Sequence, residues 1–267
     1  MATLLQGAAQ GVSVTPVPAL DDNYMYLLVD NATSQAAVVD PVDPGAMVRA
    51  ASGAGAMIVM ILTTHGHWDH AGGNAELKKA MPQLEVYGGR GDRVAAATKE
   101  VWDDDEIALG ASTIRVISTP CHTQGHVCFY VDGNVFTGDT MFVSGAGNFN
   151  SGTPRQMTDA FDKLLALPDD TQVWVGHEYT CKNCQFSVYA EPGSANAKRR
   201  LEWAKACGSV RRGGSGTVPS TIGDEKQCNP FARIDDPAIL KFVGGPPDRA
   251  ERMRLVRKGK DDWGRRR

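Results

Sequence analysis

The six histidines of this chain fall in three short segments, and aspartates accompany them. The first segment, residues 65–70, reads His-Gly-His-Trp-Asp-His, the second runs from His122 to His126, and the third holds His177 alone. Asp139 stands in a separate Gly-Asp-Thr sequence. Imidazole nitrogens and carboxylate oxygens are ligands that suit zinc, iron and manganese. The pattern therefore predicts a metal centre built from distant parts of the chain.

The spacing in the first segment predicts more than one bound cation. In an extended or turning backbone, His65 and His67 lie on the same side and can bind one cation together, whereas Asp69 and His70 point to a neighbouring position. The candidate ligands outnumber those that a single zinc ion needs, so we expect two divalent cations that share a carboxylate. The predicted metal ligands are His65, His67, Asp69, His70, His126, Asp139 and His177.

Other residues near these segments are predicted to have structural roles. His122 stands four positions before His126, and we expect it to hold its loop rather than to bind a cation. Trp68 is expected to pack against its neighbours. Cys181 and Cys184 form a C-x-x-C pair without a second such pair in the chain, so we interpret them as incidental rather than as half a zinc site.

The composition excludes several other classes of protein. A formal net charge of −3 over 267 residues gives no general attraction to nucleic acid or to an anionic membrane surface. The apolar run at 57–62 is too short to span a bilayer. The first 12 residues lack the pattern of a secretory signal, and six cysteines do not suggest a disulfide scaffold, so we expect a cytoplasmic, reduced protein. We expect it to be a monomer.

Short apolar runs precede most of the metal-binding segments and predict the strands that position them. Alternating or continuous apolar stretches predict strands over 24–29, 36–39, 57–62, 84–87, 114–117, 127–131, 134–137 and 173–175. Helices are predicted over 46–51, 74–80 and 158–167, and the Asp132-Gly133 pair predicts a hairpin.

The last third of the sequence has a different character. Helices are predicted over 195–206 and 250–258, joined by a Gly-rich loop at 208–216, and no further strand pattern follows. We therefore predict a mixed α/β domain over 1–180 and a smaller helical domain over 181–267, with the boundary near Cys181.

The motifs at these positions resemble those of a known family. The sequence is similar to the hydroxyacylglutathione hydrolases (glyoxalase II) of the metallo-β-lactamase superfamily over nearly its whole length, from about Val12 to Trp263. The resemblance implies an α+β fold, a four-layer αββα sandwich with a smaller C-terminal helical domain. The matching segments are 22–26, 64–74, 119–123, 136–140, 176–180, 217–221, 229–231 and 253–261.

The resemblance also implies roles for individual residues. It places His65, His67 and His126 on one cation, places Asp69, His70 and His177 on the other, and makes Asp139 the bridge; we assign catalysis to Asp69 and Asp139. It implies that Tyr179, Arg257 and Lys260 contact glutathione, whose carboxylates suit cationic partners. Many family members have a Lys and a Tyr where this chain has Asn148 and Asn150, which leaves the thiol carrier open.

The expected reaction is hydrolysis of a glutathione thioester, S-D-lactoylglutathione above all, to glutathione and D-lactate. Two divalent cations, zinc first and iron or manganese as alternatives, would lower the pKa of a bridging water so that hydroxide attacks the carbonyl at neutral pH. Cys121 and Cys128 are then not needed as nucleophiles. The alternatives are a thioesterase acting on another thiol carrier, a mono-iron persulfide dioxygenase, a lactonase, and a regulatory module with a vestigial metal site.

Overall fold

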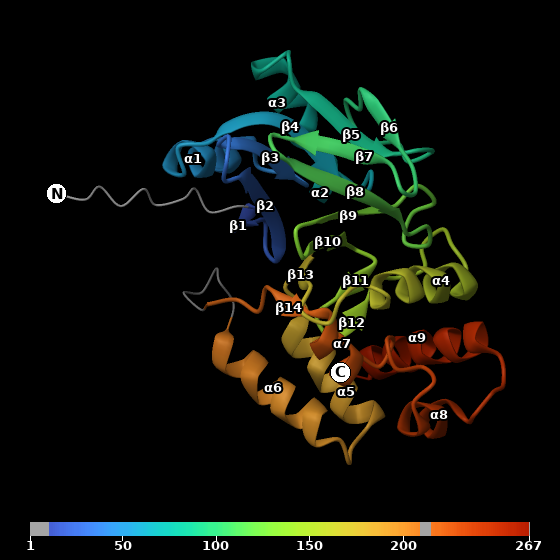
Figure 1. Cartoon of the computed structure of the whole chain (residues 1–267). Helices are drawn as coiled ribbons and strands as arrows, with labels where there is room; N and C mark the ends of the chain where they lie inside the picture. The colour runs from blue at the N-terminus through green and yellow to red at the C-terminus, as the bar shows by residue number, and fades with distance from the viewer. Residues whose placement is uncertain (1–10, 209–214, 267) are drawn as a thin grey trace.

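The computed structural model describes residues 11–208 and 215–266 (Figure 1). Most of the predicted Gly-rich loop at 208–216 lies outside the described residues. Among the described helices, none is both long enough and apolar enough to cross a membrane.

Six strands form the first sheet, in sequence order along the sheet. They are β1 (Val12–Ala19), β2 (Asn23–Asp30), β3 (Gln35–Val39), β4 (Met57–Thr63), β5 (Glu85–Gly89) and β6 (Lys99–Val101). The first two pairings are antiparallel, and the pairings from β3 to β6 are parallel. Helices α1 (Pro44–Gly53) and α3 (Asn74–Ala80) provide two of the connections. A short helix, α2 (Trp68–Ala71), carries part of the histidine-rich segment that follows β4.

The second sheet also has six strands, in the order β14-β13-β10-β9-β8-β7. Their bounds are β7 (Glu106–Leu109), β8 (Ser112–Ser118), β9 (Val127–Val131), β10 (Asn134–Gly138), β13 (Gln172–Val175) and β14 (Ser220–Thr221). Asp132 and Gly133 connect β9 to β10 with φ values of 44° and 71°, which suits a tight two-residue turn. The predicted hairpin is therefore present. A small ribbon of β11 (Met141–Phe142) and β12 (Gly145–Ala146) follows β10.

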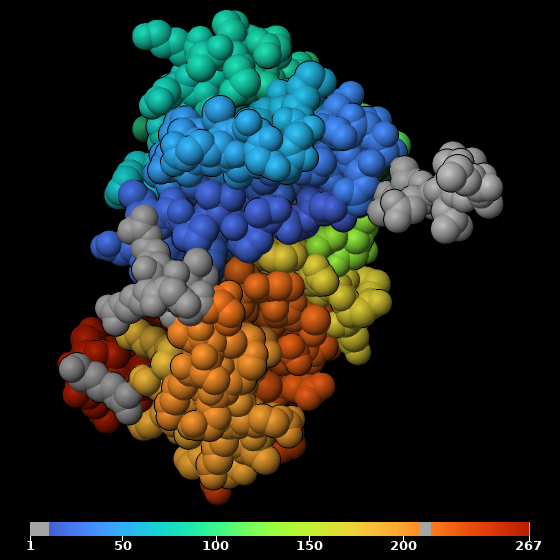
Figure 2. All heavy atoms as spheres, turned by 90° about the vertical axis from the view of Figure 1, so that its left-hand side faces the viewer, coloured from blue at the N-terminus to red at the C-terminus, as the bar shows by residue number. Residues whose placement is uncertain are grey.

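Helices cover the outer face of the second sheet and make up most of the C-terminal third (Figure 1). They are α4 (Pro154–Leu165), α5 (Thr180–Ala190), α6 (Ala195–Cys207), α7 (Ile222–Cys228), α8 (Pro237–Val243) and α9 (Arg249–Arg265). In the space-filling view, the blue and teal N-terminal part fills the upper half of the molecule, and the orange and red C-terminal helices lie below it (Figure 2).

Three hydrophobic clusters separate four layers of structure. Leu27 and Met47 belong to the cluster between the first sheet and its outer helices. Tyr26 and Phe136 belong to the cluster between the two sheets. The third cluster joins the second sheet to the C-terminal helices and includes Phe231. This arrangement is the predicted α+β fold, an αββα sandwich with a C-terminal helical region. Because the third cluster contains residues from both sides of position 180, the hydrophobic core does not divide there.

Several predicted boundaries were wrong for identifiable reasons. Helix α4 begins at Pro154 rather than at position 158, since Thr153 and Gln156 cap it reciprocally and its first turn is polar. Strand β1 was not predicted, because its two prolines weaken a strand pattern that is tolerated here at the edge of the sheet. Helices α5, α7 and α8 were also missed, and α9 extends well beyond the predicted range.

Candidate metal centre

The candidate ligands lie at one edge of the sandwich, where strands of both sheets end. His65 follows β4, Asp139 follows β10, and His177 follows β13. The two sheets meet at this edge, since the amide of Tyr24 donates to the carbonyl of Gly176 at 2.9 Å. Gly176 permits the close approach, because a Cβ there would lie 2.5 Å from Asp139 Oδ1. The fold thus brings together side chains that are more than 100 positions apart in the sequence.

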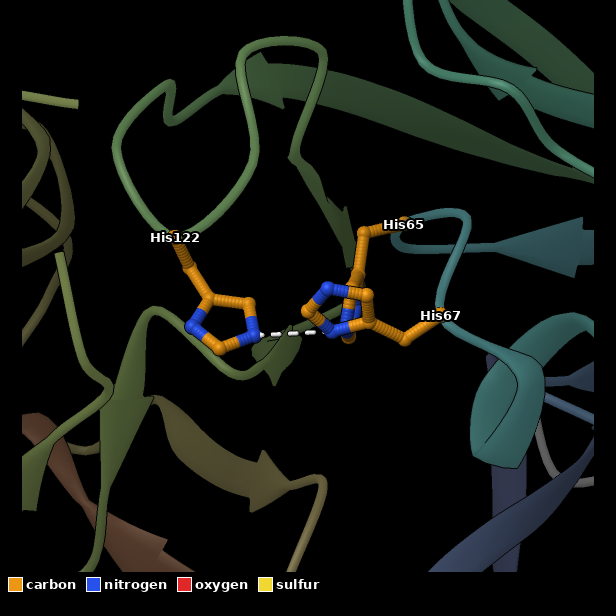
Figure 3. A group of neighbouring side chains, drawn as sticks. All are labelled: His65, His67 and His122. Atoms are coloured by element: carbon orange, nitrogen blue, oxygen red, sulfur yellow. Dashed lines mark hydrogen bonds between the residues drawn. The ribbon is translucent and has the colours of Figure 1, made fainter. Parts of the chain in front are cut away.

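Three histidines form the first group of neighbouring side chains (Figure 3). His67 Nδ1 lies 3.0 Å from His65 Nε2 and 3.1 Å from His122 Nε2. His65 and His122 are buried, and His67 is half-buried. Nitrogens of three imidazoles therefore converge on one point, as ligands of a single cation do.

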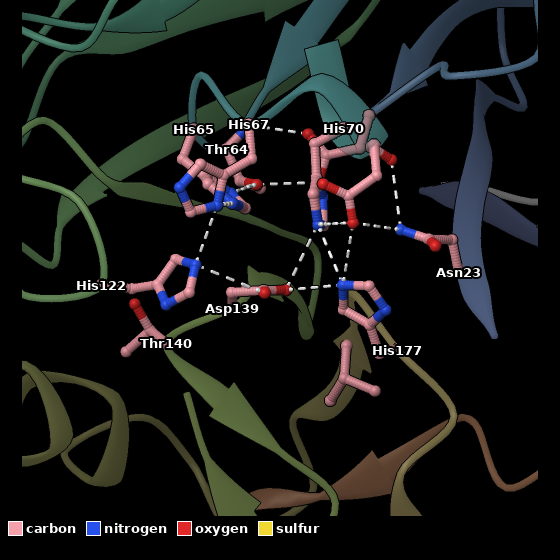
Figure 4. Close-up of polar contacts among 12 residues, drawn as sticks. Asn23, Thr64, His65, His67, His70, His122, Asp139, Thr140 and His177 are labelled. Carbon is pink, nitrogen blue, oxygen red and sulfur yellow. Dashed lines mark hydrogen bonds and ion pairs between the residues drawn. The ribbon is translucent and has the colours of Figure 1, made fainter. Parts of the chain in front are cut away.

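A second group consists of Asp69, His70 and His177, and Figure 4 labels its two histidines. His70 Nε2 is 3.2 Å from His177 Nε2 and 3.7 Å from Asp69 Oδ2. His177 Nε2 is 3.4 Å from the same Asp69 oxygen. Two imidazoles and one carboxylate again converge, which gives a second position of suitable chemistry.

Asp139 stands between the two groups (Figure 4). Its Oδ2 lies 3.5 Å from His122 Nε2, and its Oδ1 lies 3.3 Å from His70 Nε2 and 3.4 Å from His177 Nε2. Oδ1 is buried and forms no hydrogen bond with any of the described residues. A carboxylate oxygen buried in this way normally needs a strong partner, so this oxygen fits a bound cation.

The outer nitrogens of the converging rings are held by other groups. Nδ1 of His122 lies 3.0 Å from the carbonyl of Asn148, Nδ1 of His70 lies 2.9 Å from Asp40, and Nδ1 of His177 lies 2.8 Å from Asp22. Such partners fix the ring orientation and put the remaining proton on the outer nitrogen, which leaves the inner nitrogen free to act as a ligand. The same arrangement is typical of metal-binding histidines.

The structure places His122 and His126 differently from the prediction. His126 is fully buried, and its Nε2 accepts a hydrogen bond from the backbone amide of Asp139 at 3.2 Å. Its Nδ1 lies 2.8 Å from the hydroxyl of Thr119 and 3.1 Å from that of Thr140. Because both nitrogens already have partners, the structure does not place His126 in either group of converging side chains, where the sequence had predicted it. His122 occupies the place that was predicted for His126.

Burial and neighbouring charges set the protonation of the centre. Burial lowers the pKa of His65 well below its usual range, and burial also lowers the pKa of His122, so both imidazoles are neutral ligands at pH 7. Burial would raise the pKa of Asp139, but the imidazoles of His70 and His177 outweigh it and hold that pKa well below the usual range. The same carboxylate raises the pKa of His70 well above its usual range and that of His177 to about 10, against the effect of burial, so these two rings release a proton when they bind a cation.

The donor set therefore fits a pair of divalent cations of the zinc, iron or manganese kind. Five imidazoles and two carboxylates converge, and each group of three is completed by one oxygen of Asp139. No cysteine belongs to the candidate metal groups found in the described part of the chain, and Cys184 is buried with a pKa that burial raises to about 12. Bound cations at such a site lower the pKa of water and polarise a substrate oxygen.

A cavity of about 300 Å³ opens beside the cluster and reaches the C-terminal helices. His122 and Asp139 line one end of it, and Tyr179, Arg257 and Lys260, the predicted glutathione contacts, line the remainder. The ring of Tyr179 is stacked on that of His177, with 4.8 Å between their centroids. A larger cavity of about 780 Å³ lies between α5 and α8, but none of the converging side chains lines it.

Sequence reasoning missed two lining residues and misplaced one tryptophan. Lys182 and Asn183 also line the cavity, and their spacing of three and four positions from Tyr179 on one helix was a usable signal. Asn148 lines the cavity, whereas Asn150 is exposed and is absent from its lining. Trp68 does not pack as predicted: it begins the short helix α2, and 71% of its surface is exposed.

Comparisons with known proteins agree with this architecture. Residues 20–177 match the model of the metallo-beta-lactamase superfamily, which is the class that the sandwich and its His/Asp cluster define. Residues 178–263 match the model described as hydroxyacylglutathione hydrolase C-terminus. The fold is shared with ETHE1 from Myxococcus xanthus, at 23% identity and a TM-score of 0.65 over 91% of this chain and 89% of that one.

Curated relatives narrow the class further. The chain is 45% identical to the cytoplasmic hydroxyacylglutathione hydrolase of Arabidopsis thaliana, over 92% of this chain and 97% of the relative. It is 39% identical to the hydroxyacylglutathione hydrolase of Rippkaea orientalis, over 87% of this chain and 93% of the relative. The chain belongs to the hydroxyacylglutathione hydrolase family.

Proposed function

We propose that the chain hydrolyses S-D-lactoylglutathione and other 2-hydroxyacylglutathiones to glutathione and the hydroxy acid, the second step of methylglyoxal detoxification. One observation carries this proposal: the cavity that begins at His122 and Asp139 continues to the basic side chains of Arg257 and Lys260. A thioester placed at the cluster would therefore extend its anionic carrier towards positive charge. The names of the relatives, and the match to the family's C-terminal model, point to the same substrate class.

We further propose how the ligands are divided between the two cations. His65, His67 and His122 would hold the first cation, and Asp69, His70 and His177 would hold the second. Asp139 would bind both, since its two oxygens face different groups. Zinc suits this set best, and iron and manganese are the alternatives.

The chain's own residues have separable tasks in this reaction. When bound, the cations supply a water of lowered pKa and polarise the thioester carbonyl. Asp69 and Asp139 keep their carboxylates ionised, because the neighbouring imidazoles lower their pKa values against the effect of burial. Overall, water adds hydroxide to the carbonyl carbon, the C–S bond breaks, and the departing sulfur takes the proton. Neither Cys121 nor Cys128 is needed, since burial raises the pKa of each thiol to about 12.

Tyr179, Arg257 and Lys260 would contact the glutathione part of the substrate. Arg257 is held in place by Asp261 at 2.7 Å, and it also donates to the carbonyl of Ala146 at 3.2 Å. We keep the division into a catalytic domain over 1–180 and a substrate-binding domain over 181–267 as a proposal about roles, although the hydrophobic core is shared. A cytoplasmic location and a monomeric state are also proposed, the first supported by six free cysteines and by the Arabidopsis relative.

The test is hydrolysis of S-D-lactoylglutathione, measured beside the same acyl group on other thiols, with metal analysis of the same sample. We expect two metal ions per chain and fastest turnover of the glutathione thioester. Asp139→Ala should lose both activity and metal. Full activity in that variant would rule the mechanism out. One iron per chain with oxygen uptake would instead favour a persulfide dioxygenase, and faster turnover on another thiol would reassign the carrier.

A further inference from the structure

The cavity beside the metal cluster continues into a second hollow nearer the C-terminus. This second hollow has a volume of about 460 Å³, and its lining includes Asp261 and Trp263. The two hollows share four lining residues, so they form one cleft that runs away from the cluster. The shared residues are Asn148, Lys182, Arg257 and Lys260. A part of the substrate bound at this junction would lie away from the thioester at the metal cluster. Residues at the junction would therefore contact the thiol carrier.

Two of the three basic side chains at the junction already interact with neighbouring groups of the chain. Arg257 pairs with Asp261 at 2.7 Å, and only 12% of its side chain is exposed. Lys260 donates a hydrogen bond to Asn183, and burial lowers its pKa well below the usual range, with Arg257 lowering it further. Both are therefore constrained in how much positive charge they can offer to an incoming anion.

Lys182 differs from both. It is exposed at the mouth of the cleft, and within residues 11–208 and 215–266 no carboxylate lies at ion-pair distance from its ammonium group. It is the third residue of α5, where the partial positive charge of the helix N-terminus makes a lysine unfavourable. No ion pair within the described residues therefore offsets this cost. An anion bound in the cleft would offset it, because the charge of the lysine would then have a partner.

We infer that Lys182 binds a carboxylate of the glutathione part of the substrate and so selects for an anionic thiol carrier. The inference rests on the proposed function and adds a specificity-determining residue to it. Lys182 lies three residues after Tyr179, whose ring is stacked on His177, so the lysine is on the same side of α5 as the residue beside the cluster. Asn148, which lines the same junction, offers an amide but no charge.

The experiment compares Lys182→Gln with Lys198→Gln. Lys198 is an exposed lysine near the start of α6 that lines none of the cavities described above, so it controls for the loss of one surface charge. Two substrates are used, S-D-lactoylglutathione and the same lactoyl group on N-acetylcysteamine, which carries no carboxylate. For the glutathione thioester we expect Lys182→Gln to raise KM about three- to tenfold with kcat nearly unchanged, and added salt to reduce the difference. Lys182→Glu should raise KM further.

For the N-acetylcysteamine thioester, kcat/KM should be the same in all the variants. The inference is overturned if Lys182→Gln and Lys198→Gln have equal KM values for the glutathione thioester. It is also overturned if Lys182→Gln loses activity on both substrates equally, since that result indicates a role in the fold or the metal centre.

Calorimetric titration with glutathione gives a readout without turnover. If the wild-type protein binds glutathione and Lys182→Gln binds it with the same affinity, only this inference is contradicted. Wild-type protein that neither binds glutathione nor hydrolyses its thioester contradicts the proposed function as well.

Discussion

Replacing His122 and His126 one at a time separates a metal ligand from a buried structural residue. His122→Ala removes the Nε2 atom that faces His67 and Asp139, and its side chain lies at the wall of an open cavity. We expect this variant to lose cation from the group that contains His65, while its free energy of unfolding without metal stays within about 1 kcal/mol of wild type. Its hydrolytic activity should fall by at least as much as its metal content.

His126→Ala should have the opposite signature. The change leaves the backbone amide of Asp139 without its partner, and a buried unpaired donor costs about 1–3 kcal/mol. The cavity left by a fully buried ring adds about 2 kcal/mol or more. A total near 4 kcal/mol corresponds to a fall in Tm of roughly 8–16 °C for a chain of this size.

The assay is metal analysis after dialysis together with thermal unfolding of the metal-free proteins. Since His126 contacts Asp139 only through the backbone amide, His126→Ala should still bind cations through His65 and His67 when it is folded below its Tm. The reasoning is refuted if His122→Ala retains a full complement of metal while His126→Ala loses one ion without loss of Tm. That result would restore the ligand role for His126.

Four further results are expected. Asp40→Asn weakens the support of His70 Nδ1, so metal should be lost to a chelator at roughly 10–100-fold lower concentration, measured by competition. Trp68→Ala removes an exposed side chain and should change the free energy of unfolding in urea by less than about 0.5 kcal/mol. Burial raises the pKa of Cys128 to about 12, so its thiol should resist alkylation in the folded protein while half-buried Cys181 reacts, as peptide mass spectrometry would record. Because the raised pKa favours the neutral thiol in the folded state, this contribution to stability is complete below pH 9.0 and is lost towards pH 12, which denaturant titration at increasing pH would detect.

The strands that carry the metal centre were predictable because their pattern is dominated by burial. Strand β4 is a continuous apolar run that ends where His65 begins, and β10 and β13 likewise end just before Asp139 and His177. A metal-binding side chain that directly follows a buried strand lies at the edge of the sheet where that strand ends. The convergence of these residues could therefore be inferred before the fold was known.

The C-terminal helices were less predictable, since their packing depends on contacts between segments far apart in the chain. Helix α5 begins directly after the His177 segment without a side-chain cap, and its sequence has only a weak apolar stripe. Its position is fixed by tertiary contacts such as Phe186 against Phe231 and Trp263. The sequence alone contained no local signal of these partners, and the cleft residue Lys182 was missed together with the helix.

The exchange of His122 for His126 shows where motif spacing stops being informative. His122 and His126 lie four positions apart in one loop. Their positions in the sequence alone allow either of them to reach a cation. The difference comes from β9, which starts at Val127. His126 directly precedes this buried strand and lies in the interior beside Asp139. There, the backbone amide of Asp139 and the hydroxyl of Thr119 form hydrogen bonds with its two ring nitrogens. His122 is further from the strand. Its Nδ1 forms a hydrogen bond with the carbonyl of Asn148, and its Nε2 faces His67. A histidine directly before a buried strand is therefore better interpreted as a support for the ligand loop, and the histidine earlier in that loop as the ligand.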